Sequence, residues 1–210
     1  NLVTDDSRLV RPGSLFVCIR HRSFDGHTAA LDALASGAAA VVTQDRLGLE
    51  NELHVADSRS TYARLCAALC NHPERKLRMI GVTGTNGKTT VTTLIRNILS
   101  DSGTKTLLTG TVCNRLGDEN LPSGLTTPKP PELYSLLSRA VSQRCKACVM
   151  EASSQALAQG RLEGIDFDAA VFTNITRDHL DYHGTFENYI SAKKKLFEHS
   201  ALSIVNLDDP

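Results

Sequence analysis

The sequence lacks a net charge, and it lacks long hydrophobic runs. Lys+Arg and Asp+Glu both total 23 among 210 residues, so the basic excess of a nucleic-acid-binding protein or of a polybasic membrane-surface segment is absent. No apolar segment approaches the length of a membrane-spanning helix, and no secretory signal stands at the N-terminus. We therefore predict a cytoplasmic protein, a monomer without a nucleic-acid partner and without membrane insertion.

The sequence also lacks the paired cysteine motifs of a zinc site. Only one CxxC spacing occurs, at Cys145 and Cys148, and it runs directly into an apolar segment typical of a strand. Residues three apart on a strand face opposite ways and cannot share a metal ion. The six cysteines are scattered through apolar segments, as is typical of reduced cytosolic thiols; they are Cys18, Cys66, Cys70, Cys113, Cys145 and Cys148.

An initiator methionine and internal repeats are absent as well. The chain begins at Asn1 within a recognisable pattern and ends at Pro210, soon after a strand-like run. We therefore expect it to be part of a longer protein. Its 41% hydrophobic content is sufficient for a packed core, and its length suits one large domain or two small ones.

Two segments of alternating strand and helix patterns are present. In residues 1–75, strand-like runs at 15–19 and 39–43 flank a helical pattern at 28–36, and a second helix is expected to end at Cys70. Residues 71–76 contain a proline and several charges, which are typical of a linker. We predict a small N-terminal α/β domain over residues 1–75.

The second segment, residues 76–210, predicts an incomplete α/β domain with a mostly parallel sheet. Strands are expected at 78–83, 105–110, 146–151, 169–174 and 203–207, and helices at 88–100 and 132–143. Within the first of these helices, the spacing of Val91, Leu94, Ile95 and Ile98 predicts one apolar face.

A glycine-rich loop, GVTGTNGKTT at 81–90, lies between a predicted strand and a predicted helix. In that position, backbone N–H groups and the helix N-terminus favour phosphate binding. The general Walker pattern requires glycine where Val82 stands, so the loop is a variant. No Asn-Lys-x-Asp motif for guanine is present, which favours ATP. The predicted ATP-binding residues are Gly84, Thr85, Asn86, Gly87, Lys88, Thr89 and Thr90, with Thr89 also a ligand of Mg²⁺.

Polar residues follow several predicted strands, where ligands gather in doubly wound sheets. Glu151 follows CVM, Asn174 follows AAVFT, and TRDHLDYHG occupies 176–184. A glutamate and a histidine beside a phosphate loop can hold Mg²⁺. His179 and His183 have the spacing of zinc-protease histidines, but Leu180 stands where that motif requires glutamate.

One lysine lies within an apolar helical stripe. In YISAKKKLF at 189–197, Lys193 comes four residues after Tyr189 and four before Phe197, so the three share a face. A lysine at such a position either extends its amino group to water or is buried for a functional reason. Lys194 and Lys195 are expected to be solvated.

Several motifs in order resemble the Mur ligase family. They are GTNGKTT, LTTP, EASSQAL and FTNITRDHLDYHGTFENYISAKKKLF, and the opening DDSRLVRPGSLFVCIRHRSFDGH resembles the family's N-terminal UDP-binding domain. The resemblance covers essentially the whole chain and is greatest to the MurE type, which adds the third residue of the peptidoglycan stem peptide. It implies a further C-terminal domain that this sequence does not contain, and we expect residues 1–210 alone to be inactive.

The resemblance also implies a reaction and its cofactors. ATP would phosphorylate the D-glutamate carboxylate of UDP-MurNAc-L-Ala-D-Glu, and the amine of meso-diaminopimelate or L-lysine would then form the amide. Lys88, His179 and Lys193 would be catalytic. Two Mg²⁺ ions would be held by Thr89, Glu151, His179 and Lys193, the last as a carbamate formed with CO₂.

Substrate contacts carry over from the family position by position. Asp5 and Ser7 match the uridine-nucleotide site, and the dipeptide contacts are Thr126, Thr127, Ser153, Gln159 and Arg161. Leu125 stands where some relatives have asparagine, and residues 21–24 depart from the family's uracil-contact loop, so neither is assigned a contact.

Three alternatives remain open from the sequence. The chain is also compatible with a sister ligase that adds another stem residue, and with a catalytically silent, Mur-like nucleotide-binding scaffold. A nucleotide-driven switch protein is the third, although no glutamine-bearing switch motif is evident. Lys88, Thr89, Glu151, His179 and Lys193 are all present, which favours an active enzyme over a scaffold.

Overall fold

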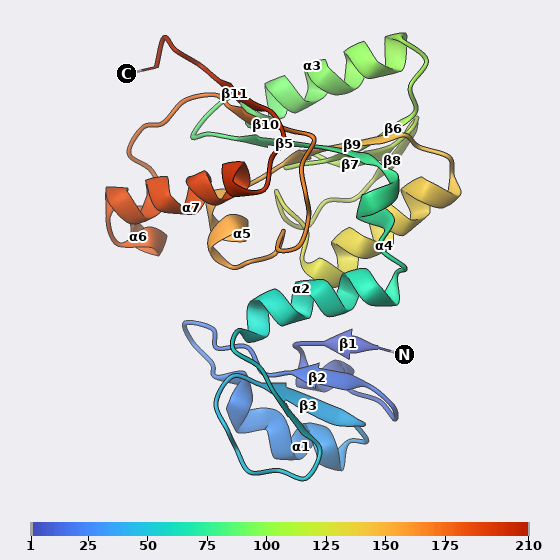
Figure 1. The fold of residues 1–210 in the computed structure, drawn as a ribbon, viewed down its shortest axis with the longest axis vertical. Helices are drawn as coiled ribbons and strands as arrows, with labels where there is room; N and C mark the ends of the chain where they lie inside the picture. Colours follow the sequence, from blue (N-terminus) through green and yellow to red (C-terminus); the bar gives the residue numbers. More distant parts are fainter. Residues whose placement is uncertain (1, 210) are drawn as a thin grey trace. The chain divides into compact units, whose positions relative to one another are not determined.

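The structure, a computed structural model, describes residues 2–209 and has mixed α/β architecture (Figure 1). It divides into two compact units, one up to Leu69 and one from Cys70 onward. No helix within the described residues is long and apolar enough to cross a membrane.

The N-terminal unit is built on a four-stranded parallel sheet of order β1-β2-β3-β4. Its core includes Phe16, Cys18, Ala33 and Val41, packed between the sheet and α1. The short strands β1 and β4 were not predicted, since each has only two or three residues. The elements are β1 (Val3–Thr4), η1 (Ser7–Leu9), β2 (Leu15–Val17), η2 (Gly26–Ala29), α1 (Ala30–Ala35), β3 (Ala40–Thr43), β4 (Glu52–His54) and α2 (Ser58–Leu69).

The second unit contains a seven-stranded sheet of order β11-β10-β5-β9-β6-β7-β8. Its elements are η3 (Pro73–Lys76), β5 (Arg78–Thr83), α3 (Lys88–Asp101), β6 (Thr106–Thr109), β7 (Asn114–Leu116), β8 (Glu119–Leu121), α4 (Pro130–Ser142), β9 (Ala147–Glu151), α5 (Ser154–Ala158), β10 (Ala169–Phe172), α6 (Leu180–His183), α7 (Phe186–Glu198) and β11 (Ser203–Val205). The strands β11, β10, β5, β9 and β6 pair in parallel.

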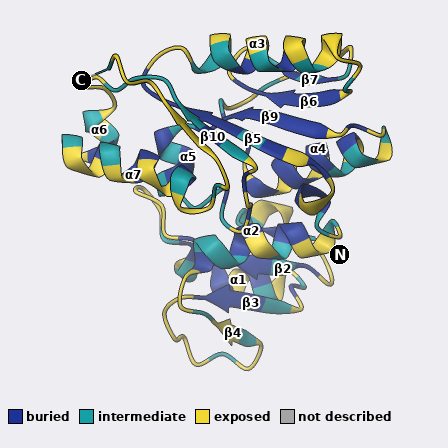
Figure 2. Ribbon diagram, turned by 45° about the horizontal axis from the view of Figure 1, so that its top comes forward, coloured by how far each residue is buried: buried dark blue, intermediate teal, exposed yellow. Residues whose placement is uncertain are grey.

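Helices cover both faces of this sheet. Helix α3 lies on one face, and α4, α5 and α7 lie on the other (Figure 1). Strand β9 is buried at every residue, and the central strands form the dark layer of Figure 2. This agrees with the apolar character of the strand sequences, since a strand covered on both faces has no polar side. The predicted mostly parallel α/β fold is confirmed.

The antiparallel hairpin β7–β8 was not predicted. It extends the sheet beyond β6 and ends in a turn at Gly117, which has a φ of +59°. Its strands have only three residues each and carry charged side chains, so the usual apolar alternation of a strand is missing. Residues 71–76, predicted to be a linker, instead belong to the second unit, where η3 packs against α4.

The predicted apolar face of α3 is wrong. Leu94 and Ile98 are 55% and 68% exposed, whereas Thr92 and Arg96 are buried. The Arg96 guanidinium donates a hydrogen bond of 2.7 Å to the carbonyl of Gly117, in the β7–β8 turn. The inward side of the helix thus carries an arginine whose partner lies in a distant segment.

Candidate active site

The glycine-rich loop connects β5 to α3 at the carboxyl end of the sheet. Gly84 and Gly87 have φ angles of +149° and +82°, which favour glycine. A Cβ atom on Gly84 would lie 1.9 Å from Thr173 Oγ1, so no larger residue fits. Gly87 is the N-cap of α3 and makes no side-chain capping bond. The first-turn N–H groups of α3 thus have no intrahelical acceptor and point toward the space that an anion would occupy.

Residues next to β10 hold this loop in place. The N–H of Thr85 donates to the carbonyl of Asn174, and the N–H of Asn86 donates to Asn174 Oδ1, both at 2.9 Å. The Thr85 hydroxyl lies 3.0 Å from Tyr189 Oη. The backbone N–H groups of Thr85 and Asn86 are therefore already hydrogen-bonded within the protein. The main hydrogen-bond donors left for a phosphate are those of the first turn of α3, with Lys88, Thr89 and Thr90.

Two lysines meet beneath the loop. Lys88 Nζ donates to the carbonyls of Gly84 and Thr85 at 2.9 and 2.8 Å, and Lys193 Nζ donates to the same Gly84 carbonyl at 2.7 Å. Lys193 is 2% exposed, so its amino group does not extend into bulk solvent. The Lys193 ammonium also lies 4.6 Å from the centre of the Tyr189 ring.

Burial changes the acid–base properties of both lysines. Loss of solvation, followed by the positive charge of Lys88, lowers the pKa of Lys193 to about 7, although Asp178 opposes the shift. The pKa of Lys88 is also lowered, mainly by burial, with Glu151 and Asp178 opposing. A neutral Lys193 amine is therefore well populated at neutral pH, whereas an exposed lysine is almost fully protonated there.

The Glu151 carboxylate ends β9 and is 1% exposed. It accepts hydrogen bonds from the Thr89 hydroxyl and from the N–H and hydroxyl of Thr111, each at 3.0 Å. A Cβ atom on Gly110 would lie 2.3 Å from Glu151 Oε1. The carboxylate is thus held firmly beside the first turn of α3, which contains Thr89.

A cavity of about 200 Å³ joins the lysines to most of the predicted dipeptide contacts. Thr127 donates to the Glu151 carbonyl at 2.7 Å, and Ser153 N–H donates to the Thr127 hydroxyl at 3.0 Å. Arg161 donates to the Thr127 carbonyl at 2.8 Å and to Gln159 Oε1. The predicted residues that line the cavity are Lys88, Thr126, Thr127, Ser153, Arg161, His179 and Lys193.

His179 occupies a less enclosed position. Its backbone has a φ of +52°, its side chain is 49% exposed, and its Nε2 lies 3.5 Å from Asp178 Oδ2. No group of three or more His, Cys, Asp or Glu side chains in residues 2–209 is arranged to hold a metal ion. Thr89 and Glu151 are the predicted metal ligands that are already in contact.

Sequence reasoning missed several groups at this site. Thr111 contacts Glu151, and Tyr189, predicted only as an apolar stripe residue, reaches the loop through Thr85. The His183 ring is buried, with Nε2 3.0 Å from the Ser154 hydroxyl. Only the position of Thr111 after a predicted strand could have indicated its role, because its partner is 40 residues away.

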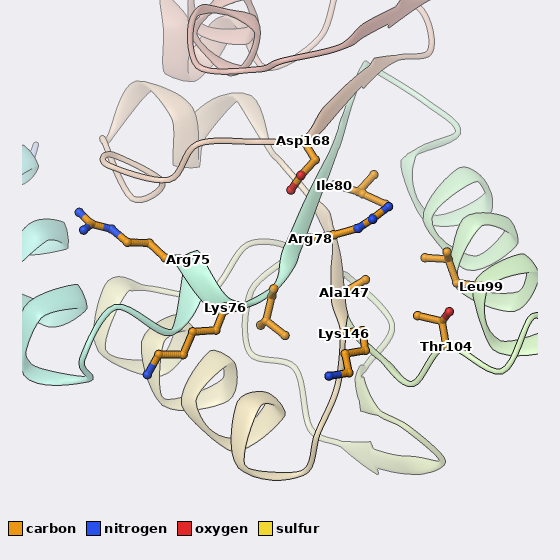
Figure 3. Close-up of a pocket in the computed structure, with 10 residues that line it drawn as sticks. Arg75, Lys76, Arg78, Ile80, Leu99, Thr104, Lys146, Ala147 and Asp168 are labelled. Atoms are coloured by element: carbon orange, nitrogen blue, oxygen red, sulfur yellow. The ribbon is translucent and has the colours of Figure 1, made fainter.

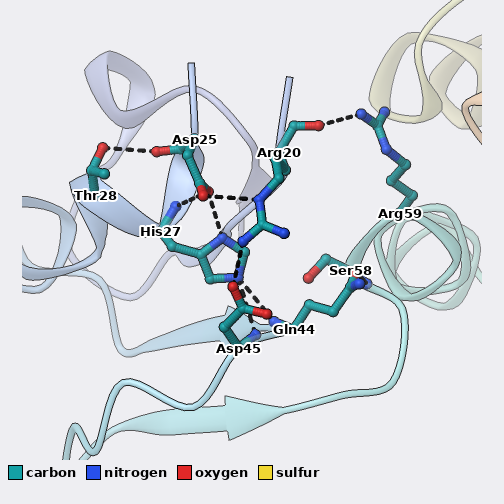
Figure 4. Close-up of polar contacts among 8 residues, drawn as sticks. All are labelled: Arg20, Asp25, His27, Thr28, Gln44, Asp45, Ser58 and Arg59. Carbon is teal, nitrogen blue, oxygen red and sulfur yellow. Dashed lines mark hydrogen bonds and ion pairs between the residues drawn. The ribbon is translucent and has the colours of Figure 1, made fainter. Parts of the chain in front are cut away.

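The predicted uridine-site residues belong to the N-terminal unit. Asp5 accepts a hydrogen bond of 3.1 Å from Tyr62 Oη and lies 3.6 Å from His21 Nε2, while Ser7 begins η1. Nearby, the 25–27 turn is held by a polar network (Figure 4). Asp25 bonds both Arg20 and the His27 ring.

A larger cavity, of about 770 Å³, lies at the end of the second unit's sheet where β5 and β9 begin, opposite the phosphate loop (Figure 3). Its basic residues Arg75, Lys76, Arg78 and Lys146 extend in different directions. None of the predicted site residues lines it, so it is separate from the site built around the phosphate loop.

Comparison with known protein families agrees with this geometry. The family model for the Mur ligase middle domain matches residues 82–210, and the model for the Mur ligase family catalytic domain matches residues 1–71. The chain belongs to the Mur ligase family. Among individual Mur ligases, it is 42% identical to UDP-N-acetylmuramoyl-L-alanyl-D-glutamate–2,6-diaminopimelate ligase of Clostridium perfringens, over 98% of this chain and 43% of that protein.

Other Mur ligases show a similar degree of relationship. The protein of the same name from Geobacillus kaustophilus is 44% identical, over 98% of this chain and 44% of its own length. A solved structure of such a diaminopimelate ligase has a TM-score of 0.85 at 36% identity, over 99% of this chain and 43% of that chain. The chain thus spans less than half the length of these Mur ligases.

More distant solved structures share the fold alone. MurF of Thermotoga maritima, solved with ADP, has a TM-score of 0.61 at 24% identity, over 100% of this chain and 46% of that chain.

Proposed function

We propose that the chain forms the nucleotide-binding and acceptor-binding parts of an ATP-dependent ligase. It would join 2,6-diaminopimelate to the D-glutamate of UDP-MurNAc-L-Ala-D-Glu in peptidoglycan synthesis. The observation that carries this proposal is the single cavity that Lys88 and Lys193 share with Thr126, Thr127 and Arg161. Cationic groups for phosphate and polar groups for a carboxylated acceptor thus open onto one space.

The proposed reaction has two steps. The D-glutamate γ-carboxylate oxygen attacks the γ-phosphorus of ATP, which forms an acyl phosphate and releases ADP. The amine of the incoming amino acid then attacks the acyl carbon; the C–O bond to phosphate breaks, the amine loses a proton, and an amide and inorganic phosphate result. Such reactions depend on alignment and on neutralising the negative charge of the phosphoryl group, a role that we assign to Lys88.

Thr89 and Glu151 are suited to a magnesium ion. Both present oxygen atoms, which Mg²⁺ prefers, and the two groups lie 3.0 Å apart at the first turn of α3. When bound, Mg²⁺ would neutralise phosphate charge and align the β and γ phosphates. His179 and Lys193 line the adjacent cavity, and we propose them as the site of a second ion.

Lys193 is suited to carbamylation. A neutral amine attacks CO₂, the new N–C bond forms, and one proton is released, which leaves an anionic carbamate in place of a cation. The low pKa of Lys193, about 7, provides the neutral amine, and its 2% exposure keeps it from bulk solvent. An anion at this position would also relieve the repulsion between Lys193 and Lys88.

The remaining substrate contacts follow from chemistry and position. Arg161 is oriented by Gln159 and by the Thr127 carbonyl, and its guanidinium suits a carboxylate. We assign the dipeptide to Arg161 together with Thr126, Thr127, Ser153 and Gln159. We assign the uridine nucleotide to the N-terminal unit, with Asp5 and Ser7.

The test measures phosphate release by the full-length gene product with ATP, Mg²⁺ and UDP-MurNAc-L-Ala-D-Glu. Diaminopimelate, lysine and other amino acids are added one at a time. Release that requires both the UDP-dipeptide and diaminopimelate is expected. Release that requires the UDP-dipeptide and a different amino acid would replace diaminopimelate as the residue that is added. Nucleotide binding without release for any amino acid would indicate a sister ligase or a silent scaffold. Because the relatives are more than twice as long, we expect residues 1–210 alone to bind nucleotide but to form no amide.

A further inference from the structure

Thr111 holds both oxygens of the Glu151 carboxylate. It lies two residues after β6 ends, and its backbone N–H donates to Oε1 while its hydroxyl donates to Oε2, each at 3.0 Å. The hydroxyl of Thr89 also reaches this carboxylate, through Oε1. The hydroxyl of Thr111 therefore sets the orientation of the oxygen that Thr89 does not contact.

The same hydroxyl also contacts Thr126, which we assigned to the acceptor substrate, the UDP-dipeptide. Thr111 Oγ1 lies 3.0 Å from Thr126 Oγ1. An ionised carboxylate cannot donate a hydrogen bond, so the single proton of the Thr111 hydroxyl points to Glu151. The Thr126 hydroxyl must then be the donor to Thr111. The three groups form a chain with one direction, from Thr126 through Thr111 to Glu151.

The loop that carries these threonines is closed at its base. Ser123 Oγ donates to the Gly110 carbonyl at 2.6 Å, and it also lies 3.1 Å from the Leu125 carbonyl. This closes residues 110–125 into a compact excursion that contains the β7–β8 hairpin. Thr111 and Thr126 are thereby held as neighbours, although 15 positions separate them in sequence.

Packing does not explain the choice of residue at position 111. Thr111 is exposed and lines the cavity of the candidate site. An exposed hydroxyl usually contributes little to folding stability, whereas a hydrogen bond that orients a metal-binding carboxylate strongly affects metal affinity.

We propose that Thr111 is a positioning residue that couples the acceptor contact at Thr126 to the metal-binding carboxylate of Glu151. Acceptor bound at Thr126 strengthens or redirects the hydrogen bond to Thr111, and Thr111 transmits the change to Glu151 Oε2. Metal and acceptor affinities are then linked reciprocally. This inference rests on the proposed function for the identity of the acceptor, and on the contacts above for the coupling.

The test compares Thr111→Val with Thr111→Ser in the full-length gene product. Valine keeps the shape and removes the hydroxyl, whereas serine keeps the hydroxyl. Thr109→Val is the matched control, since Thr109 is two residues away and its buried hydroxyl has no hydrogen-bond partner among the described residues. Thermal unfolding is measured for each variant, and Thr111→Ser keeps the test informative if the valine variant unfolds.

The measured quantity is the Kd of Mn²⁺ in the presence of ADP, which is determined from water-proton relaxation. It is measured once with and once without UDP-MurNAc-L-Ala-D-Glu. Thr111→Val should weaken Mn²⁺ binding about tenfold and abolish any dependence of the Mn²⁺ Kd on the UDP-dipeptide. Thr111→Ser and Thr109→Val should behave as the wild type, which should show that dependence.

Unchanged Mn²⁺ affinity in Thr111→Val would overturn the proposal, as would equal losses in the serine and valine variants. A wild-type Mn²⁺ Kd that is independent of the UDP-dipeptide would overturn the coupling. Failure of the proposed function is recognised separately, because phosphate release would then be absent from wild-type protein that still binds Mn²⁺ and ADP.

Discussion

The amino groups of Lys88 and Lys193 donate hydrogen bonds to one oxygen, the carbonyl of Gly84. One lysine begins α3 and the other lies in α7, more than 100 positions later in the sequence. Two cations that share a hydrogen-bond acceptor, Lys193 buried and Lys88 half-buried, repel each other, and this repulsion contributes to the low pKa of Lys193. An anion bound beside them, whether phosphate or carbamate, would relieve it.

Replacing Lys193 should stabilise the protein while it removes activity. The pKa of Lys193 falls from its ordinary value to about 7 in the folded state, so the unfolded chain binds more protons between these values. The burial penalty is complete below pH 7 and disappears as pH rises toward 10. Lys193→Met should therefore raise the free energy of unfolding by roughly 1–4 kcal/mol at pH 6, and less at pH 9.

Urea denaturation at both pH values measures this effect. The Gly84 carbonyl keeps Lys88 as a partner in the variant, so no acceptor is left unsatisfied. The control is Lys195→Met, at an exposed position of the same helix. A destabilised Lys193→Met protein at pH 6 would contradict the expectation.

In ligase assays, Lys193→Ala should be inactive and partly restored by a short carboxylate.

Glu151→Gln should weaken nucleotide-dependent metal binding by at least tenfold. The amide keeps the shape of the side chain but loses the negative charge, and it presents one oxygen where Thr89 and Thr111 now find two. Titration of the protein with Mn²⁺ in the presence of ADP measures the loss. Glu132→Gln, at an exposed position in the first turn of α4, should bind as the wild type does. Equal affinities in the two variants would remove Glu151 from the metal site.

Gly110→Ala should impair the site through Glu151. The new methyl group would lie 2.3 Å from Glu151 Oε1, so the carboxylate must move and lose its bonds to Thr89 and Thr111. We expect about a tenfold weaker metal affinity and a loss of stability of about 1–3 kcal/mol. Gly124→Ala is the control, because a Cβ atom there meets no atom within 4 Å. Metal titration and thermal unfolding of both variants measure these two effects. Metal affinity and stability of Gly110→Ala equal to those of the wild type would show that Glu151 moves freely.

Asp25→Asn should destabilise the N-terminal unit at neutral pH. Hydrogen bonds from the His27 N–H and ring hold the pKa of Asp25 well below its usual range. His27 Nε2 accepts from the N–H groups of Gln44 and Asp45, so its Nδ1 carries the proton that Asp25 binds (Figure 4). The ionised carboxylate therefore stabilises the fold above its unfolded pKa, near 4, and this contribution is lost as pH falls.

The expected loss in Asp25→Asn is about 1–3 kcal/mol at pH 7 and clearly smaller at pH 3. Urea denaturation at the two pH values provides the comparison. Asp32→Asn, at an exposed position of α1, should change stability little. A loss of equal size at both pH values would mean that the charge of Asp25 is unimportant.

The sequence by itself determined the fold class and the location of the phosphate loop. Strand β5 and the start of α3 were predicted at the residues where they occur, because a buried strand, a glycine turn and a helix each leave a local pattern. The place of Lys193 within an apolar helical stripe was also predictable, since its neighbours at helical spacing are apolar, whereas its burial was not, because a lysine that extends its amino group to water fits the same stripe. These properties depend on residues close together in the chain.

Only the tertiary structure decided which distant groups meet. Thr111 reaches Glu151 and Thr126, and Lys193 shares an acceptor with Lys88, through contacts that no local pattern encodes. The inward face of α3 was mispredicted for the same reason, since the partner of Arg96 lies in the β7–β8 turn. Periodicity indicates which residues would favour burial, whereas the buried face and its hydrogen-bond partners depend on how separate elements pack, and this packing creates the candidate site.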